Sequence, residues 1–372
     1  MNAVGIIFAD DYDTSIDELT EKRTLAAIPF GARYRIIDFA LSNMANSGIL
    51  NVGVVTTTKY ESLMGHIRSG AEWDLDRKQS GVTILSPFSF RSNKTRYENL
   101  LEALQANMSY LNNSTEKYVL ITCCNSIGNV DYQKMLEKHI ASGARVTCLY
   151  TKAPLNKQEG INCSEYETAD GSVIKDVLFT NAPDEGAKVA TNTYIMERLD
   201  LLDLLKDSIE NNKKSFRKDV LIPLLKTSLI MGYETDAKLL YMDTVSAYLK
   251  GNLDLLDQTI RDELFRQETR PILTKVGDSA PAFYGPESKV TNSIVAAGTV
   301  IEGEVRNSVI FRGVHIKKGA VVENSVVNQY SIIGEGAKLN YAVLDKGAII
   351  NDKRVLSGYI THPFVVKKGT II

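Results

Sequence analysis

Three aspartates, Asp10, Asp11 and Asp13, follow the first predicted strand of the chain, in the segment A-D-D-Y-D-T-S. Residues 3–8 have the apolar character of a buried parallel strand, and residues 14–23 have the pattern of the helix after it. In α/β domains that bind nucleotides, such a turn is rich in glycine, because backbone N–H groups must approach phosphate oxygens at a helix N-terminus. Each carboxylate near a triphosphate costs on the order of a few kcal/mol at an effective dielectric constant near 20. The turn has the position of a phosphate-binding loop with the wrong charge, and the simplest alternative is an Asp-rich turn that caps a helix.

The elements around this turn indicate an α/β domain. From the N-terminus to about residue 254, short aliphatic runs alternate with helical patterns, for example K-Y-V-L-I-T and then Y-Q-K-M-L-E-K-H-I. This alternation is typical of βαβ units in a mostly parallel sheet. We therefore predict a Rossmann-like domain over residues 1–256 and a proline-containing linker over residues 257–288.

The period of the apolar pattern changes to six over residues 289–372. Aliphatic residues at this spacing form three series, which are Ile310, Ile316 and Val322; Val327, Ile333 and Leu339; and Leu344, Ile350 and Leu356. Gly-Thr or Gly-Ala pairs at 298, 319, 336 and 347 mark the turns. Hexapeptide periodicity predicts a left-handed parallel β-helix, which we expect to dock on another domain or subunit.

Composition narrows the class of protein. With 43 Lys and Arg against 45 Asp and Glu, the net charge of −2 gives no electrostatic support for a nucleic-acid or membrane partner. The N-terminus has no signal-peptide pattern, and no apolar stretch approaches transmembrane length, so we expect a cytoplasmic protein. The four cysteines, Cys123, Cys124, Cys148 and Cys163, form no C-x-x-C pair, so we expect free thiols.

A long segment carries a specific resemblance. Residues 19–43, L-T-E-K-R-T-L-A-A-I-P-F-G-A-R-Y-R-I-I-D-F-A-L-S-N, closely resemble the signature of the ADP-glucose pyrophosphorylase family, the glucose-1-phosphate adenylyltransferases. Similar stretches follow at residues 46–56, 66–77, 81–85 and 251–256 and in the hexapeptide repeats, so the resemblance covers essentially the whole chain. It implies a nucleotidyltransferase domain followed by a left-handed β-helix, and a connection to glycogen biosynthesis.

The resemblance also implies that the nucleotide-binding residues are replaced. The family's glycine-rich loop falls on residues 9–16, where the three aspartates replace glycines and Ser15 replaces a phosphate-binding arginine. The family's active-site lysine is Leu25 here, its adenine-reading glutamine is Thr57, and its G-T-A-D-A segment is N-L-L-E-A at residues 99–103.

The resemblance implies that the residues at the family's Mg²⁺-binding and sugar-phosphate-binding positions are also replaced. The family holds Mg²⁺ with two aspartates, since this ion prefers hard anionic oxygen ligands. The first falls on Asn125 and the second near Tyr241, although a shift of the alignment would make Asp243 the second ligand. The family's sugar-phosphate Glu and Lys fall on Phe179 and Thr180. We therefore expect no bound Mg²⁺ and no catalytic residues at these positions.

Basic residues match the family at positions outside the catalytic site. Lys22, Arg23 and Arg35 match family positions of an effector site between the two domains, and Arg312 and His315 are further candidates for it. Such residues bind phosphate groups through charge-assisted hydrogen bonds. The alternative for Arg35 is a structural pairing with Asp38.

Three functions are compatible with parts of this pattern. The first is a regulatory, catalytically silent subunit, similar to the GlgD-type subunits of bacterial glycogen synthesis. It would assemble with a catalytic ADP-glucose pyrophosphorylase subunit into a hetero-oligomer such as a tetramer, or into a homo-oligomer when alone, and bind a phosphorylated small-molecule effector. The second is an active adenylyltransferase with a remodelled site. The third, a hexapeptide acyltransferase, needs a catalytic histidine between coils; only His315 and His362 lie in the repeats, and the N-terminal domain would be unexplained.

Overall fold

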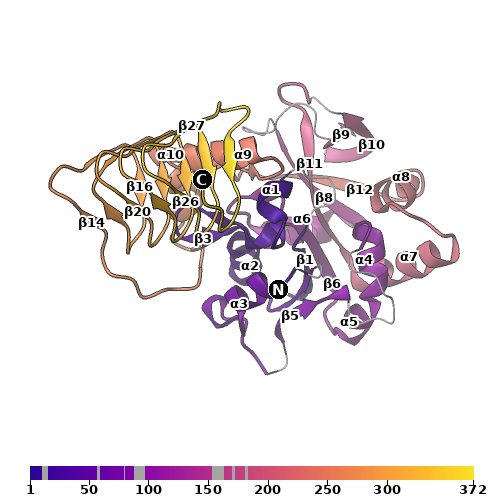
Figure 1. The fold of residues 1–372 in the computed structure, drawn as a ribbon. Coiled ribbons are helices and arrows are strands. Elements are labelled where there is room, and N and C mark those ends of the chain that lie inside the picture. The colour runs from indigo at the N-terminus through magenta and orange to yellow at the C-terminus, as the bar shows by residue number, and fades with distance from the viewer. Residues whose placement is uncertain are drawn as a thin grey trace.

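The computed structural model describes residues 1–10, 16–56, 59–78, 80–87, 97–152, 163–169, 172–180 and 183–372. An α/β part and a β-helix lie side by side, as Figure 1 shows, with the N-terminus in the former and the C-terminus in the latter. In the described part of the chain, no helix is long and apolar enough to cross a membrane.

A nine-stranded sheet forms the centre of the α/β part. In spatial order its strands are β5 (Gly81–Leu85), β4 (Asn51–Val55), β1 (Ala3–Phe8), β6 (Tyr118–Cys123), β11 (Lys188–Glu197), β8 (Val146–Lys152), β12 (Ile230–Glu234), β10 (Val173–Thr180) and β9 (Cys163–Ala169). The half from β5 to β6 is parallel, as the βαβ pattern predicts. The other half is mixed, because β11 runs antiparallel to β6 and β8, and β10 runs antiparallel to β9 and β12.

Helices cover both faces of this sheet. They are α1 (Asp17–Thr20), α2 (Ile36–Asn46), α3 (Glu61–Ile67), α4 (Leu100–Ala106), α5 (Met108–Asn113), α6 (Tyr132–Ser142), α7 (Arg198–Glu210), α8 (Ile222–Leu225), α9 (Val245–Asp254) and α10 (Gln258–Phe265). Alternate residues of β1 enter two separate cores, Ile7 on the face of α2, α6 and α9, and Ile6 on the face of α4 and α7. The helix predicted over residues 14–23 is shorter, since in its described part only α1 is helical.

The C-terminal part is a left-handed β-helix built from three parallel sheets. One sheet contains β14 (Phe283–Tyr284), β17 (Val300–Ile301), β20 (His315–Ile316), β23 (Ile332–Ile333) and β26 (Ile349–Ile350). The second contains β15 (Lys289–Thr291), β18 (Glu304–Arg306), β21 (Val321–Glu323), β24 (Lys338–Asn340) and β27 (Val355–Ser357). The third contains β16 (Ile294–Val295), β19 (Val309–Ile310), β22 (Val326–Val327), β25 (Ala342–Leu344) and β28 (Phe364–Val366).

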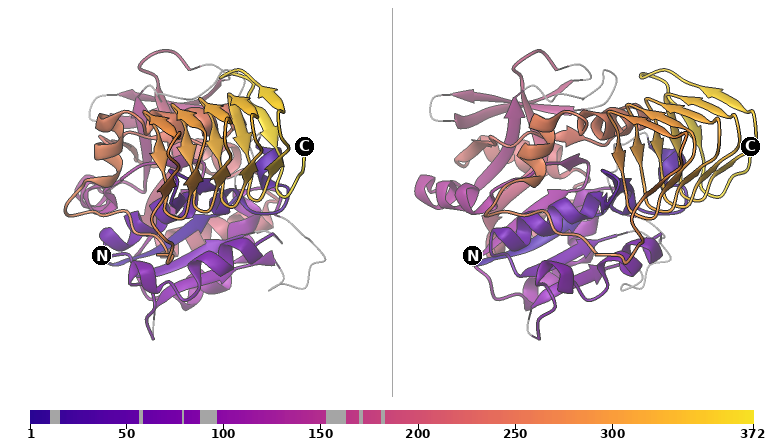
Figure 2. Two further views of the ribbon diagram at one scale, coloured as in Figure 1. Left: turned by 60° about the vertical axis from the view of Figure 1, so that its left-hand side comes forward. Right: turned by 90° about the vertical axis from the view of Figure 1, so that its left-hand side faces the viewer.

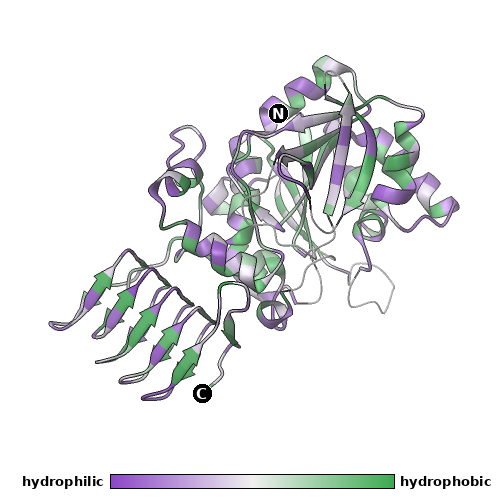
Figure 3. Ribbon diagram, turned by 90° about the horizontal axis from the view of Figure 1, so that it is seen from above, coloured by the Kyte–Doolittle hydropathy of each residue, from purple (hydrophilic) through white to green (hydrophobic). Residues whose placement is uncertain are grey.

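The aliphatic residues at spacing six form the core of this β-helix. Ile310, Ile316, Val322, Val327 and Ile333 are fully buried there. In Figure 3 the strands of the β-helix are mostly apolar, and the turns between them are largely hydrophilic. The prediction of a hexapeptide β-helix is confirmed.

The predicted linker contains regular structure. Helix α10 lies within residues 257–288, and β14 in the same segment pairs in parallel with β17. The first coil of the β-helix therefore begins at Phe283 and not at residue 289. This two-residue strand lacks the Asn-Ser and glycine punctuation of the later coils, which is why the repeat pattern did not reveal it.

The two parts of the chain share one core. Phe311, Val326 and Val343 of the β-helix belong to the same apolar cluster as residues of α2 and α9. The Tyr248 hydroxyl of α9 donates to the carbonyl oxygen of Pro29 at 2.8 Å and lies 3.4 Å from Asn328 Oδ1 of the β-helix. The views of Figure 2 agree that the β-helix lies against the α/β part. The β-helix is thus docked on the α/β part of the same chain. The sequence predicted docking on another domain or subunit, and the domain is the partner seen here.

Candidate functional site

The parallel half of the sheet brings together two predicted active-site positions, Asp10 of the first loop and Asn125 of the predicted metal site. Phe8 at the end of β1 is in register with Val55 of β4 and with Cys123 of β6. The carboxyl ends of these strands therefore lie at one edge of the sheet. Asp10 and Asn125 each follow two residues after a strand, and both are placed at this edge.

Asp10 is linked to a second substituted position. The backbone N–H of Leu25 donates to Asp10 Oδ1 at 3.0 Å, at the start of the 3-10 turn η1 (Leu25–Ala27). The Leu25 side chain is fully buried in the apolar core. It carries no charge and offers no cation to a phosphate. By contrast, α1 has Ile16 at its N-cap and no side-chain cap. Asp10 therefore stabilises the segment after the loop. The other predicted nucleotide-site positions, Asp11, Asp13, Ser15 and Thr57, lie outside the described residues.

The two predicted metal-ligand positions also come together. Strand β7 (Ser126–Ile127) pairs antiparallel with β13 (Leu240–Tyr241), and Tyr241 is opposite Ser126. The backbone N–H of Met242 donates to the carbonyl oxygen of Asn125 at 2.8 Å. Asn125 and Tyr241 are both buried. The alignment of these two positions is therefore spatially consistent.

The residues at this place do not fit the two-carboxylate Mg²⁺ site of the family. The amide of Asn125 is neutral. Burial and then the nearby Asp243 carboxylate and Cys163 raise the pKa of the Tyr241 phenol, which stays protonated. Asp243 is a buried carboxylate two residues after Tyr241, and in the described chain no three His, Cys, Asp or Glu side chains form a group that could hold a metal ion. We derive no metal-dependent step for this chain.

A cavity of about 220 Å³ remains at this edge of the sheet. Its wall includes the carboxylates of Asp10 and Glu98 and the guanidinium of Arg217, and the other lining residues are Phe8, Asn99, Leu100, Cys123, Asn192, Tyr194, Ser215 and Phe216. Ligand pockets are usually about 300–1,000 Å³. The cavity is therefore small for a nucleotide, and the two carboxylates would repel its phosphates.

The segment at residues 99–103 serves a helix terminus. Asn99 is the N-cap of α4, and its Oδ1 accepts a hydrogen bond from the backbone N–H of Glu102 at 2.9 Å. Glu102 Oε2 in turn accepts one from the backbone N–H of Glu98 at 2.6 Å. These polar side chains stabilise the start of α4, in the manner of a capping box.

The predicted sugar-phosphate positions carry no acid. Phe179 is 46% exposed, and its ring lies 5.9 Å from the Arg217 guanidinium and 5.0 Å from Lys218 Nζ. Arg217 also donates to Ser164 Oγ at 2.7 Å. At Thr180 the structure shows its carbonyl oxygen accepting a contact from Cys163 Sγ at 3.3 Å. Phe179 thus makes cation–π contacts with Arg217 and Lys218.

A second candidate site lies between the α/β part and the β-helix. Arg35 ends the short hairpin of β2 (Pro29–Phe30) and β3 (Tyr34–Arg35), and its Nη1 donates to the carbonyl oxygen of Ser62 at 2.7 Å and to Ser62 Oγ at 3.0 Å. Asp38 accepts the backbone N–H of Arg35 at 2.9 Å, while its carboxylate also contacts His66 Nε2 at 2.5 Å. The structural pairing of Arg35 with Asp38 therefore involves the backbone of Arg35 and leaves the guanidinium to Ser62.

Other cations surround Arg35. Burial, opposed by Asp38, and then repulsion by Arg23 and Arg312 lower the pKa of Arg35 to about 10. Partial desolvation and then the charges of Arg35, Arg23 and Arg312, among others, lower the pKa of Lys346. Desolvation and the charges of Arg68, Arg35 and Arg312 do the same for Lys275.

We call Arg35, Arg312, Lys346 and Lys275 the cationic cluster. In the described part of the chain, none of these four forms an ion pair with a carboxylate. A Cβ atom at Gly277 would lie 2.2 Å from Arg312 Nη1, so the glycine leaves room for the guanidinium. The arrangement is suited to an anion with several oxygen atoms.

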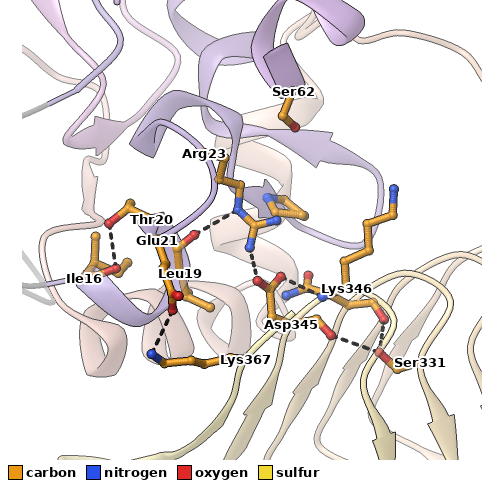
Figure 4. A network of polar contacts seen from close by, with 12 residues as sticks. Ile16, Leu19, Thr20, Glu21, Arg23, Ser62, Ser331, Asp345, Lys346 and Lys367 are labelled. Atoms are coloured by element: carbon orange, nitrogen blue, oxygen red, sulfur yellow. Dashed lines mark hydrogen bonds and ion pairs between the residues drawn. The ribbon is translucent and has the colours of Figure 1, made fainter. Parts of the chain in front are cut away.

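The other predicted effector residues have different surroundings. Arg23 is buried, its guanidinium pairs with the carboxylate of Asp345, and its Nε donates to the carbonyl oxygen of Leu19 at 2.9 Å (Figure 4). Lys22 is exposed and lines a small cavity together with Arg23, Asp345, Lys367 and Lys368, and with Glu18 and Glu21. His315 Nε2 contacts Glu302 Oε2 at 2.9 Å on the β-helix.

Sequence reasoning missed two members of the cationic cluster. Lys346 lies at a coil turn in the segment L-D-K-G-A, and Lys275 lies in the predicted linker. A lysine at either place is ordinary surface composition. Lys346 comes near Arg35 through the docking of the β-helix, whereas the segment of Lys275 lies along α2 and α3, where Lys275 Nζ donates to the carbonyl oxygen of Gly65 at 3.0 Å. Neither the Gly-Ala turn pattern of the coils nor the composition of the linker indicates that these two lysines lie near an anion site.

Comparisons with known proteins agree with this architecture. The family model described as nucleotidyl transferase matches residues 4–238, and the model described as GlmU-like, C-terminal hexapeptide matches residues 282–358. The chain is 30% identical over 372 residues to the glycogen biosynthesis protein GlgD of Bacillus subtilis (strain 168), covering 99% of this chain and 96% of that protein. It is 33% identical over 362 residues to a glucose-1-phosphate adenylyltransferase of Bacillus cytotoxicus, with 95% and 94% covered. To that of Mycoplasma mobile it is 34% identical over 328 residues, with 86% and 84% covered.

Fold and site together define a nucleotidyltransferase domain joined to a hexapeptide β-helix. The chain belongs to the glucose-1-phosphate adenylyltransferase, or ADP-glucose pyrophosphorylase, family. Its identity to the protein named GlgD and to proteins named as the enzyme is nearly the same, so identity alone does not separate a regulatory from a catalytic role.

Proposed function

We propose that this chain is a regulatory, catalytically inactive subunit of glucose-1-phosphate adenylyltransferase in glycogen biosynthesis. It would modulate a catalytic partner that makes ADP-glucose from ATP and glucose 1-phosphate. The observation that supports the proposal is that Asn125 and Tyr241, onto which the resemblance maps the two Mg²⁺-binding aspartates of the family, lie on adjacent segments.

The chemistry of the reaction explains why this pair matters. Transfer of a nucleotidyl group depends on positioning and on neutralising the charge that develops on the phosphates. In the family, Mg²⁺ supplies much of that neutralisation. Here a neutral amide and a protonated phenol take the ligand positions, and the Asp10 and Glu98 carboxylates add negative charge at the cavity.

The cationic cluster supports the regulatory part of the proposal. Arg35 belongs to the α/β part and Arg312 and Lys346 to the β-helix, and Arg35 and Arg312 both lower the pKa of Lys346, so an anion bound among them would touch both parts. A phosphorylated small molecule that binds one arrangement of these parts better than another shifts the equilibrium between them, with a typical coupling of about 1–3 kcal/mol. Regulation of a partner requires such a differential affinity.

The names of the relatives support the pathway. One relative is named as a glycogen biosynthesis protein, and others are named for the adenylyltransferase reaction. A chain with the fold of this family and without its catalytic side chains can act in the pathway by associating with a catalytic subunit. We propose a hetero-oligomer with a catalytic subunit in the cytoplasm.

One observation favours a second candidate, an active enzyme with a remodelled site. Asp243 is buried close to the segment of Asn125 and offers one carboxylate. A metal held by Asp243 together with substrate phosphates would need no second protein carboxylate. Activity of the purified chain alone separates the two candidates.

The test is co-expression with a catalytic homologue and measurement of ADP-glucose synthesis against effector concentration. We expect a complex by light scattering, no synthesis by the chain alone, and an activation curve that differs from that of the catalytic homologue by itself. Turnover by the isolated chain at an ordinary enzymatic rate, about 1 per second or more, would favour the second candidate. Absence of any complex would count against the subunit role.

A further inference from the structure

The β-helix has three flat faces, and two of them have clear surroundings. On the sheet of β16, β19, β22, β25 and β28, Val326 and Val343 are fully buried in one apolar cluster with residues of α9. On the sheet of β15, β18, β21, β24 and β27, Arg306 pairs with Glu304 at 2.9 Å and with Glu323 at 2.6 Å, and all three side chains are partly exposed. The first face is therefore docked on the α/β part, and the second is charged and suited to contact with water.

The third face is mostly apolar. Its strands are β14, β17, β20, β23 and β26, and the labelled ones, β14, β20 and β26, follow one another along one side of the β-helix (Figure 1). Their parallel register aligns one residue per strand into a row, which we call the apolar row and which consists of Phe283, Val300, His315, Ile332 and Ile349. The residue that follows each of the last four is buried in the core of the β-helix, so the apolar row points outward.

The apolar row joins no apolar cluster in the described part of the chain. Phe283 is 57% exposed, and the other four members are half-buried. By contrast, Val326 and Val343 show that an outward row of this kind is fully buried where another element covers it. A contiguous apolar surface with a polar border is typical of a protein–protein contact.

Two charged residues border the apolar row. Glu302 directly follows β17 and Lys317 directly follows β20, so they occupy equivalent positions on neighbouring strands. Both are partly exposed, and Glu302 Oε2 contacts His315 Nε2 at 2.9 Å. A twofold axis between β17 and β20, parallel to the strands, brings a second copy face to face with the first and reverses the order of its strands. Glu302 of each copy then lies opposite Lys317 of the other. The same axis places Phe283 of one copy opposite Ile332 of the other.

Charge complementarity favours this arrangement over its neighbours. An axis along β20 would set Lys317 against Lys317 of the second copy, and these like charges repel each other. With the axis between β17 and β20, opposite charges meet twice, which fixes the register of the contact.

We propose that the face formed by β14, β17, β20 and β23 is a docking surface for a second copy of this chain, with Glu302 of each copy paired with Lys317 of the other. Four strands spaced about 4.8 Å apart make a patch about 20 Å wide, which is small beside the standard interface of about 800 Å² per partner. The dimer is therefore weak, with a Kd of micromolar order. The inference concerns contacts between copies of this chain, so it does not depend on whether the chain is catalytically inactive.

The test is sedimentation velocity of the full chain at concentrations from about 1 to about 100 μM, which bracket a Kd of micromolar order. We expect a monomer–dimer equilibrium. Ile332→Glu places a charge in the apolar row and should weaken the dimer at least tenfold, because that charge loses water on association. Val321→Glu is the matched control, since Val321 is also a half-buried residue of a β-helix strand but lies in β21, on the charged face. It should leave the dimer unchanged.

Charge reversal tests the twofold arrangement and also serves if Ile332→Glu fails to fold. Glu302→Lys and Lys317→Glu each set like charges against one another across the contact, so each should weaken the dimer about tenfold. The double variant Glu302→Lys/Lys317→Glu restores opposite charges and should recover the natural affinity to within about threefold. A double variant as weak as the single ones would overturn the inference.

Other results also decide against this docking surface. If the natural chain stays monomeric over the whole concentration range, or if Ile332→Glu associates as strongly as the natural chain, the inference is wrong. If the natural chain does not self-associate but binds a catalytic homologue, and Ile332→Glu abolishes that binding, the face belongs to the catalytic subunit and not to a second copy. Synthesis of ADP-glucose by the isolated chain, measured separately, tests the proposed function and leaves this inference untouched.

Discussion

The carboxylate of Asp10 accepts a hydrogen bond from the backbone N–H of Leu25 at 3.0 Å. The resemblance of the sequence to the family implies that both positions depart from its catalytic pattern. The contact makes the two departures parts of one local structure, in which an acidic side chain anchors the segment after the loop and an apolar side chain fills the core behind it. Asp10 therefore has a structural role at the end of β1, and its carboxylate would repel a phosphate group placed there.

Asp10→Ala should lower the free energy of unfolding by about 1 kcal/mol, because the Leu25 N–H loses its acceptor. Asp10→Asn keeps an oxygen in the same position and should leave stability near that of the natural chain. Urea unfolding of the three proteins measures this difference. Equal stability of all three would mean that the contact contributes nothing.

Asn125→Asp alone should not produce Mg²⁺-dependent ADP-glucose synthesis. The variant restores one carboxylate, yet Tyr241 remains a buried neutral phenol and the cavity keeps the carboxylates of Asp10 and Glu98. The measurement is a radiometric or coupled assay with ATP and glucose 1-phosphate. Strong activity from this single change would show that the charge at the loop does not prevent nucleotide binding.

Arg35→Gln should weaken binding of inorganic phosphate to the chain by about tenfold, since one charge-assisted partner is lost. In the mixed complex it should also raise the effector concentration needed for half-maximal response. Arg354→Gln is the control with the same charge change at an exposed position of the β-helix. If both variants bind phosphate equally well, Arg35 has only a structural role.

Gly277→Ala should weaken phosphate binding without removing any charge. The new Cβ would lie 2.2 Å from Arg312 Nη1 and must displace that guanidinium. Gly285→Ala is the matched control, because a Cβ at Gly285 would meet its nearest atoms at 3.4 Å, an ordinary van der Waals distance. An unchanged phosphate affinity in folded Gly277→Ala would exclude Arg312 from the anion site.

Sulfate binding at alkaline pH should take up protons. The pKa of Arg35 is lowered to about 10, and the pKa values of Lys346 and Lys275 are also lowered, because burial and mutual repulsion disfavour their charged forms. A bound anion favours those charged forms and raises the pKa values toward normal, so affinity falls as the pH rises through about 10. Calorimetry at pH 9.5 in buffers of different ionisation enthalpy measures the uptake. No uptake would place sulfate away from these three groups.

The same lowered pKa of Arg35 has a consequence for stability. A base whose pKa is lower in the folded protein than in the unfolded chain destabilises the fold while it is charged in both states. This cost is present below pH 10 and is relieved as the pH rises toward the ordinary arginine value. A bound anion relieves it at neutral pH, which is a physical reason for the chain to be stabilised by its ligand.

Sequence alone determined the architecture, and it predicts the replaced catalytic positions. The alternation of strands and helices predicted the α/β domain, and the period of six predicted the β-helix, because both patterns follow from which side chains must be buried. The residue types at Asp10, Leu25, Asn125 and Tyr241 were readable against the family pattern without coordinates.

Tertiary structure alone decided what the surviving cations do. Lys22, Arg23 and Arg35 are close in sequence and looked like one set, but Arg23 is paired with Asp345, which is 322 positions away. Lys22, Arg23 and Asp345 line one cavity, and Arg35 is not among its lining residues. Lys346 joins Arg35 because the β-helix docks on the α/β part, and Lys275 joins it because the preceding segment lies along α2 and α3. Electrostatic partners depend on distance in space, which local periodicity does not encode, so the composition of the cationic cluster could not be obtained from the sequence.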